Sequence, residues 1–147
     1  MGGGRDSFFG KSEKPAYFNI ANENVLLGVM IEDKEGVEAS DDIASVDGID
    51  LLFVGPGDLS QSYGVHRDPG DPISKPVILE AFEKVGASCK KHGKFMGTAV
   101  DPGESMSMAV SRGTTWLNCC HDVTAITTGY ESAMQQTNHI IENTKIL

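Results

Sequence analysis

The sequence lacks several features that would assign it to a protein class at once. Its 21 acidic residues outnumber its 12 basic residues, giving a net charge of −9, whereas proteins that bind duplex nucleic acid carry the opposite excess. No apolar run approaches the roughly 18 residues that a membrane-spanning helix needs, and the first residues lack the apolar stretch of a signal peptide. We therefore expect a cytoplasmic protein with neither a nucleic-acid nor a membrane partner.

Cysteine is scarce, and its spacing is uninformative for metal binding. The three cysteines, Cys89, Cys119 and Cys120, form no CxxC pair, and His92 and His121 stand at no zinc-ligand spacing. This pattern argues against a disulfide scaffold. We expect buried, reduced thiols, as in a protein of the cytosol.

The overall composition is that of a folded domain. Hydrophobic residues make up 39% and charged residues 22% of the 147 residues, which excludes a disordered chain and fits a single core. Residues 1–24 contain several glycines and Pro15, and we expect them to form a leader loop with a short helix near residues 16–24. Residues 25–147 are expected to form the folded domain.

Short apolar runs alternate with longer helical patterns along residues 25–147. The expected strands cover residues 25–31, 51–54, 95–100 and 115–120. The expected helices cover residues 35–46, 76–92, 104–111 and 123–143, and residues 63–75 are expected to form a long loop. Strict alternation predicts right-handed βαβ units and a parallel sheet. No glycine-rich dinucleotide fingerprint follows a strand, which weakens a Rossmann interpretation.

Four βα units amount to half of an eight-unit (β/α)8 barrel, which needs about 250 residues. A chain of 147 residues is too short to close such a barrel alone. Four parallel strands would leave two open sheet edges and an uncovered apolar face, and such surfaces favour association. The partner could be a second copy, a separately encoded barrel half, or the remainder of a cleaved chain.

Two acidic residues are the strongest candidates for chemistry. Glu32 and Asp58 are each the first acidic residue after a buried apolar strand, and neighbouring strands lie about 4.8 Å apart. Two carboxylates that close repel each other unless a cation lies between them. A hard divalent ion such as Mg²⁺ or Mn²⁺ suits such a pair. The alternative is that both acids are solvated or cap the following helices.

The second candidate is the segment Gly55-Pro56-Gly57-Asp58-Leu59-Ser60. Its glycines allow a ligand to approach the backbone closely. The N–H groups of Gly57 and Asp58 could then hold a carboxylate. The alternative is a tight turn with no ligand.

The segments Val29-Met30-Ile31-Glu32 and Gly55–Ser60 together resemble the class II, metal-dependent pyruvate aldolase family of the HpcH/HpaI type. This family includes 4-hydroxy-2-oxo-acid aldolases, 2-dehydro-3-deoxyglucarate aldolases and macrophomate synthase. The similarity continues through residues 94–100 and 120–124, and it covers roughly residues 25–135. It implies the C-terminal half of a phosphoenolpyruvate/pyruvate-type TIM barrel, in which oligomers exchange the last helix.

The resemblance also implies roles for individual residues. Glu32 and Asp58 would be the metal ligands, for Mg²⁺, Mn²⁺ or Co²⁺, and the backbone at Gly57 and Asp58 would receive the carboxylate of a 2-oxo acid such as pyruvate or oxaloacetate. The implied activity is carbon–carbon bond cleavage or condensation through a pyruvate enolate, or oxaloacetate decarboxylation. The catalytic histidine and the substrate-binding arginine of the family lie in the other barrel half, so no catalytic residue is assigned.

Two other functions remain open at this point. One is an acyl-CoA lyase of the citrate or malyl type, which shares the paired acids but should add basic residues near the active-site mouth. The other is a truncated, non-catalytic paralogue that acts as an assembly subunit. In each case we expect a homo-oligomer or association with a missing barrel half.

Five further polar residues carry weaker expectations. His66 and Arg67 fit a solvated loop, and His121 fits the mouth of the site or an interface. Asp101 is expected to cap the helix that follows it. Asp33 differs from the small or hydroxylic residue usual in the family after the glutamate, and it either faces away from the metal or disturbs it.

Overall fold

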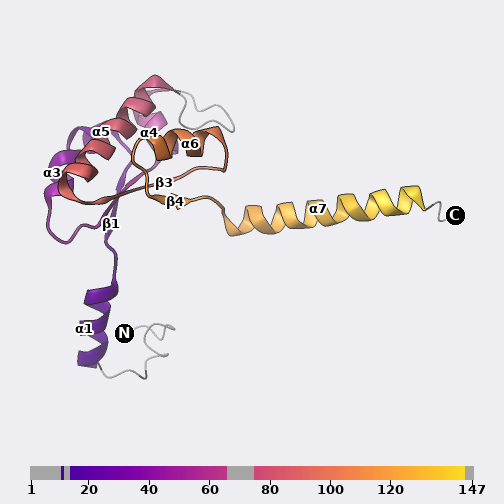
Figure 1. Cartoon of the computed structure of the whole chain (residues 1–147), viewed down its shortest axis with the longest axis horizontal. Helices are drawn as coiled ribbons and strands as arrows, with labels where there is room; N and C mark the ends of the chain where they lie inside the picture. Colours follow the sequence, from indigo (N-terminus) through magenta and orange to yellow (C-terminus); the bar gives the residue numbers. More distant parts are fainter. Residues whose placement is uncertain (1–10, 12–13, 66–74, 145–147) are drawn as a thin grey trace.

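The computed structural model describes residues 11, 14–65 and 75–144 (Figure 1). The strands are β1 (Gly28–Ile31), β2 (Leu51–Val54), β3 (Phe95–Ala99) and β4 (Trp116–Asn118). The helices are α1 (Lys14–Asn24), α2 (Lys34–Glu38), α3 (Ser40–Ser45), α4 (Pro56–Tyr63), α5 (Pro76–His92), α6 (Glu104–Ser111) and α7 (Asp122–Asn143). Within these described ranges, no helix is both long and apolar enough to cross a bilayer.

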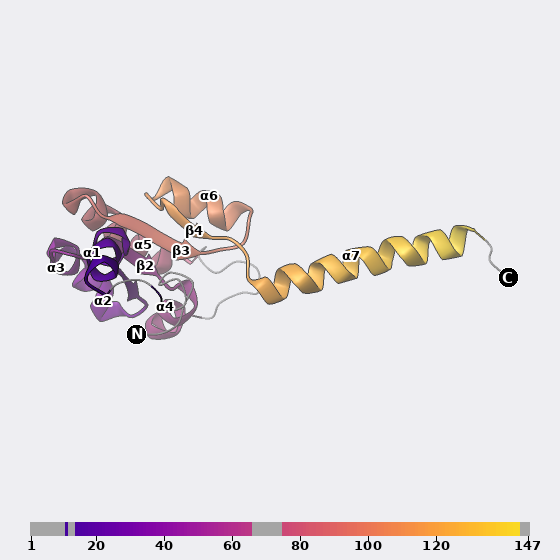
Figure 2. The ribbon, with the colours of Figure 1, turned by 90° about the horizontal axis from the view of Figure 1, so that it is seen from below.

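The four strands form one parallel sheet in the order β1-β2-β3-β4. Each strand pairs with the strand that precedes it in the sequence, as expected for successive right-handed βα units. Helices α3 to α6 cover one face of the sheet, whereas α1 and α7 leave the body in different directions (Figures 1 and 2). The predicted α/β class and parallel sheet are confirmed, and β1 and β4 are the open edges.

The hydrophobic core lies between the sheet and α5. The strands contribute the buried side chains Ile31, Leu52, Val54 and Met96. Helix α5 packs an apolar stripe against them, formed by Ile78, Ala81, Phe82, Val85 and Cys89, all of them buried. Burial of each large side chain in such a core contributes about 1.5–3 kcal/mol, so this layer stabilises the packing of β1, β2 and β3 against α5.

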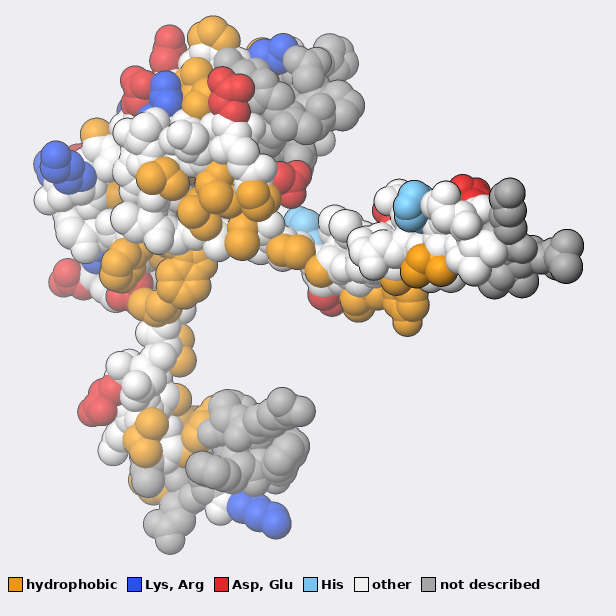
Figure 3. Space-filling view, turned by 45° about the vertical axis from the view of Figure 1, so that its right-hand side comes forward, with side chains coloured by type: hydrophobic (Ala, Val, Ile, Leu, Met, Phe, Trp, Pro, Cys, Tyr) orange, Lys and Arg blue, Asp and Glu red, His pale blue; other side chains and the backbone are white. Residues whose placement is uncertain are grey.

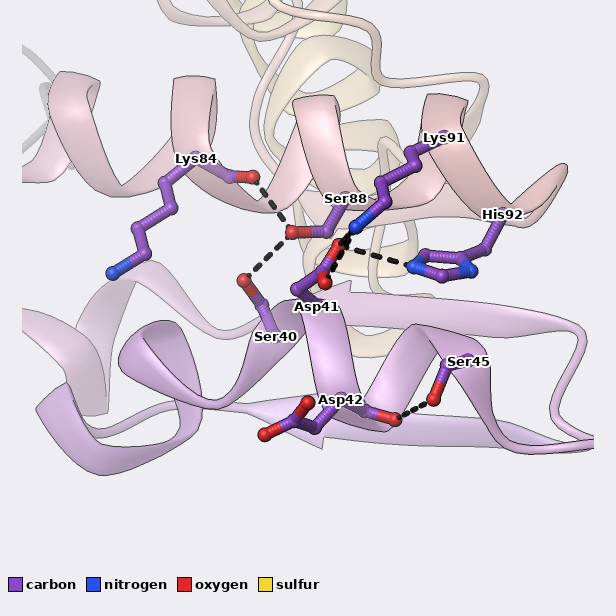
Figure 4. A network of polar contacts seen from close by, with 8 residues as sticks. All are labelled: Ser40, Asp41, Asp42, Ser45, Lys84, Ser88, Lys91 and His92. Carbon is purple, nitrogen blue, oxygen red and sulfur yellow. Dashed lines mark hydrogen bonds and ion pairs between the residues drawn. The ribbon is translucent and has the colours of Figure 1, made fainter.

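A polar network fixes α3 against the last turns of α5 (Figure 4). Asp41 accepts hydrogen bonds from Lys91 Nζ at 2.7 Å and is 3.0 Å from His92 Nε2, and the hydroxyls of Ser40 and Ser88 are 3.0 Å apart. The hydrogen bonds from Lys91 and then from His92 lower the pKa of Asp41 below its ordinary value. The network therefore orients α3 against α5, while the apolar core supplies most of the stabilisation.

No helix of the described residues covers the opposite face of the sheet. Its exposed side chains include Met30, Phe95 and Trp116, which are 54%, 50% and 46% accessible. Hydrophobic side chains gather over this region in the space-filling view, and others lie along α7 (Figure 3). Every described residue of α7 is exposed, so no side of this helix is buried within the described structure.

Several element boundaries differ from the sequence predictions. The first strand begins at Gly28 rather than at residue 25, and the helix predicted over residues 35–46 is divided at Ala39 into α2 and α3. Helix α1 agrees with the short helix expected near residues 16–24. The division into a leader and a domain at residue 25 stays a prediction.

Helix α4 was missed, because a Gly-Pro-Gly segment suggested a turn. Gly55 is its N-cap, Pro56 occupies the first helical position, and Gly64 ends the helix with φ of 69°. Proline at the first position and glycine just past the last are common helix boundaries. Those two residues were the signal that could have revealed α4.

Candidate active site at the carboxyl edge of the sheet

Glu32 and Gly55 lie opposite each other where β1 and β2 end. The register pairs Ile31 with Val54, and Gly55 N–H donates to the Ile31 carbonyl at 3.0 Å. A Cβ atom placed on Gly55 would lie 3.3 Å from Glu32 Oε2 and 3.3 Å from Met30 Cε. The Glu32 carboxylate therefore extends over Gly55 on the same side as Met30, and the absence of a side chain at position 55 leaves room for it.

Helix α4 places Asp58 just beyond this point. Asp58 lies in the first turn, and its side chain is exposed. Leu59 N–H donates to the Gly55 carbonyl at 3.0 Å, and Ser60 Oγ donates to the Pro56 carbonyl at 2.6 Å. The helix itself offers no acceptor to the N–H groups of Gly57 and Asp58, because they belong to the first turn. These two donors and a carboxylate are thus presented together at the start of α4.

The segments that follow Glu32 and Asp58 are tied to each other. Asp33 Oδ1 accepts a hydrogen bond from Gly36 N–H at 2.6 Å and caps α2. Lys34 N–H donates to Ser62 Oγ at 3.1 Å, and Lys34 Nζ lies 5.4 Å from the centre of the Tyr63 ring. The side chain of Asp33 is therefore engaged in its own helix cap, and α2 is held against the end of α4.

A cavity of about 350 Å³ opens at this edge. Its lining comes from the ends of all four strands and the elements that follow them: Met30, Phe53, Gly55, Pro56, Gly57, Asp58, Ala99, Val100, Asp101, Asn118, Cys119, Cys120, His121 and Thr124. Cavities of this size hold small ligands. Parallel α/β proteins place their chemistry at the carboxyl ends of their strands, so this cavity is the candidate site.

A larger cavity of about 760 Å³ lies at the opposite edge of the sheet. Lys94 and Thr115, in its lining, precede β3 and β4. Lys94 therefore lies at the amino edge of the sheet, away from the ends of the strands that carry Glu32 and Asp58. Despite its size, this cavity is the weaker candidate for a functional site, because residues at the amino ends of barrel strands usually serve stability.

The two predicted metal ligands lie at the same edge. Neither Glu32 nor Asp58 makes a hydrogen bond or ion pair to another described residue. No group of three His, Cys, Asp or Glu side chains in residues 14–65 and 75–144 is arranged to hold a metal ion. The described chain therefore offers two acidic oxygen donors, which suit a hard divalent cation that takes its other ligands from water or substrate.

The structure also tests the weaker expectations for individual polar residues and for the three cysteines. Asp101 does not cap α6, because Gly103 occupies the N-cap position and no side chain bonds there. Cys89 is buried as expected, but Cys119 and Cys120 are exposed, since the strand that precedes them ends at Asn118. His121 lines the cavity, as expected of a residue at the mouth. His66 and Arg67 lie outside the described residues.

Known proteins resemble this chain in both sequence and fold. The sequence pattern of the HpcH/HpaI aldolase/citrate lyase family matches residues 6–127. A 5-keto-4-deoxy-D-glucarate aldolase of Enterobacter sp. (strain 638) is 39% identical over 83 residues, which are 56% of this chain and 31% of that protein. A pyruvate aldolase of Rhizobium etli is 30% identical over 118 residues, which are 80% of this chain and 45% of that protein.

A solved structure extends the likeness to the backbone. An HpcH/HpaI aldolase/citrate lyase family protein from Burkholderia cenocepacia J2315 superposes with a TM-score of 0.74 and 28% sequence identity. The alignment covers 94% of this chain and 51% of that protein. The chain thus spans less than half the length of the two curated relatives and about half of the solved one.

Proposed function

The chain belongs to the HpcH/HpaI aldolase/citrate lyase family, and we propose that it supplies the metal-binding part of a divalent-metal-dependent carbon–carbon lyase acting on 2-oxo acids. The observation that carries this proposal is the meeting of Glu32 and the Gly55–Asp58 segment at the carboxyl edge of adjacent parallel strands. The proposed reaction is aldol cleavage or condensation of a 2-oxo acid, or decarboxylation of oxaloacetate. Its relatives named as sugar-acid and pyruvate aldolases support the substrate class.

Glu32 and Asp58 are the proposed ligands of Mg²⁺ or Mn²⁺. Their support is that Glu32 extends over Gly55, that Asp58 lines the cavity, and that neither carboxylate has a described partner. Their oxygens are therefore available to a hard cation. A divalent cation bound there would act as a Lewis acid toward negative charge developing on the keto oxygen of the substrate. Gly55 supports the arrangement by leaving space beside Glu32 Oε2.

The first turn of α4 is the proposed binding site for the substrate carboxylate. The N–H groups of Gly57 and Asp58 point out of the helix start, where the helix dipole favours a negative group. Pro56 contributes no N–H at the first position, so the two donors that follow it define the site. The chain would thereby orient the keto group of the substrate toward the two carboxylates.

The chain is proposed to depend on a partner for turnover. Among the described residues no histidine other than His121 lines the cavity, and no arginine or lysine does. A cation for the second substrate would therefore come from another barrel half, whereas His121 is the one imidazole in the described lining. The open edges at β1 and β4 and the uncovered face with Phe95 and Trp116 support docking of such a half or of a second copy.

The absence of basic residues from the described cavity lining disfavours an acyl-CoA lyase. A non-catalytic assembly subunit is the second candidate, and the lack of lysine and arginine in the described cavity lining favours it. The two candidates differ in their expected affinity for a divalent metal. The lyase must bind the metal, whereas an assembly subunit has no need of a metal ion.

Metal titration provides the first experiment. We expect Mn²⁺ to bind the purified chain, and Glu32→Gln or Asp58→Asn to weaken binding by about tenfold or more, since each removes one of two charged ligands. Asp101→Asn is the matched control, because Asp101 is an exposed acid in the same cavity. Equal Mn²⁺ affinity in all four proteins would exclude the metal site.

A turnover assay provides the second experiment. Pyruvate release from oxaloacetate would be measured with Mg²⁺, with and without chelator, for the chain alone and for the chain mixed with the N-terminal half of the Rhizobium etli pyruvate aldolase. We expect chelator-sensitive release in the mixture and much less from the chain alone. No release in either sample, despite metal binding, would contradict the proposed lyase activity.

A further inference from the structure

Two of the three thiols lie on the wall of the candidate cavity. Cys119 and Cys120 are exposed, and both line the cavity that also contains Gly57 and Asp58. Cys89 is 2% accessible and belongs to the core. The buried thiol of Cys89 can therefore serve as an internal control for the accessible thiols of Cys119 and Cys120.

The backbone holds the two accessible thiols in place. Val100 N–H donates to the Asn118 carbonyl at 3.2 Å, which fixes the end of β4 immediately before Cys119. Cys120 Sγ donates to the His121 carbonyl at 3.4 Å, whereas no described residue accepts a hydrogen bond from Cys119. Because the carboxyl edge of a closed barrel is its open mouth, docking of another barrel half would leave this wall accessible.

We propose that Cys119 and Cys120 form a site of reversible modification by small disulfides, and that the modification blocks the cavity. The thiolate of one cysteine attacks a sulfur of the small disulfide, a protein–reagent S–S bond forms, and the reagent S–S bond breaks. The leaving thiolate takes up the proton that the cysteine released, so no other oxidant is required. The blocking effect rests on the proposed function, whereas the modification itself does not.

A mixed disulfide is the expected product rather than a bond between the two cysteines. Adjacent Cα atoms lie about 3.8 Å apart across a trans peptide, whereas disulfides usually join Cα atoms about 4.4–6.8 Å apart. A bond between Cys119 and Cys120 would therefore be strained and easily reopened by a free thiol. An attached small thiol avoids that strain and extends into a cavity of about 350 Å³.

The charge of the cavity predicts which disulfides react. Asp58 and Asp101 lie in its lining, and the described lining has no lysine or arginine. A cationic disulfide is attracted to this wall and an anionic one is repelled. Cystamine should therefore modify Cys119 and Cys120 faster than oxidised glutathione does, with a difference that shrinks as salt is added.

The experiment compares peptides by mass spectrometry after treatment of the folded chain with cystamine. We expect the peptide that contains Cys119 and Cys120 to gain the reagent mass at least about tenfold faster than the peptide that contains Cys89. Cys119→Ser and Cys120→Ser each leave one reactive thiol, and the double variant should leave none that reacts quickly. Equal rates at Cys89, or loss of two hydrogens without added reagent mass, would overturn the proposal.

A protection experiment tests the blocking effect. Mn²⁺ with pyruvate should slow the modification, and the modified chain should bind Mn²⁺ and pyruvate more weakly until dithiothreitol restores it. Unchanged rates in a sample that demonstrably binds both ligands would refute blocking. If the chain binds neither ligand, the proposed function fails, and the labelling rates still decide the thiol site.

Discussion

The two faces of the sheet differ in how far this chain completes them. The face beneath α5 is closed, and Phe82, Leu52 and Val54 have no measurable exposure. The other face, with Phe95 and Trp116, remains about half accessible. Stability therefore comes from one face, whereas the proposed chemistry lies at the edge of the face that the chain leaves open.

The largest expected effect is on the covered face. Phe82→Ala should lower the free energy of unfolding by about 3–5 kcal/mol, because it leaves a cavity in a closed core. Phe95→Ala, on the uncovered face, should change it by less than about 1 kcal/mol. Urea denaturation of both variants measures the difference, and similar losses would mean that the uncovered face is packed in solution.

Two glycines make a second comparison between the faces. A Cβ atom at Gly86 would lie 2.2 Å from the Arg112 carbonyl oxygen, whereas one at Gly97 would lie 2.7 Å from Phe53 Cδ2. Gly86→Ala should cost about 1–3 kcal/mol, because backbone must move. Gly97→Ala should cost less, because the Phe53 ring lies on the uncovered face and can turn. Thermal unfolding of both variants tests this order.

A third prediction concerns self-association of the chain through the uncovered face. A charge at Trp116 opposes burial of that face, so Trp116→Glu should raise the dissociation constant of any self-association by about tenfold or more. Sedimentation over a range of concentrations measures it. Ser111→Glu, on an exposed position of α6, is a control that adds the same charge elsewhere. A stable monomer in the wild-type chain would contradict docking of a second copy.

The last expected effect appears only at alkaline pH and concerns the ionisation of a thiol on the covered face. Burial raises the pKa of Cys89 from 9.0 to about 11. The unfolded chain then loses this proton at lower pH than the folded chain does, so stability is full below pH 9 and falls as the pH rises toward about 11. Urea midpoints across that range should fall less steeply in Cys89→Ala. An identical slope would assign the loss to other groups.

Much of the architecture could be predicted from the sequence because its signals are local. The apolar run at Leu51–Val54 and the stripe along Pro76–His92 gave β2 and α5 with their observed boundaries. Helix α4 was missed because its sequence contains few apolar residues and the glycines around Pro56 resemble those of a turn. The boundaries at Gly28 and Ala39 depended on where neighbouring elements pair and pack, which one segment cannot encode.

The candidate site, too, was only partly predictable from the sequence. The sequence alone determined that acids follow two consecutive apolar strands, since strand identity and chain order are readable from residue types. Only the tertiary structure decided that Glu32 lies over Gly55, that Asp33 is engaged in a helix cap, and that Cys119 and Cys120 lie on the cavity wall. The reason is physical: side-chain direction and exposure depend on strand register and on which face other elements cover, and those arise from contacts between residues distant in the chain.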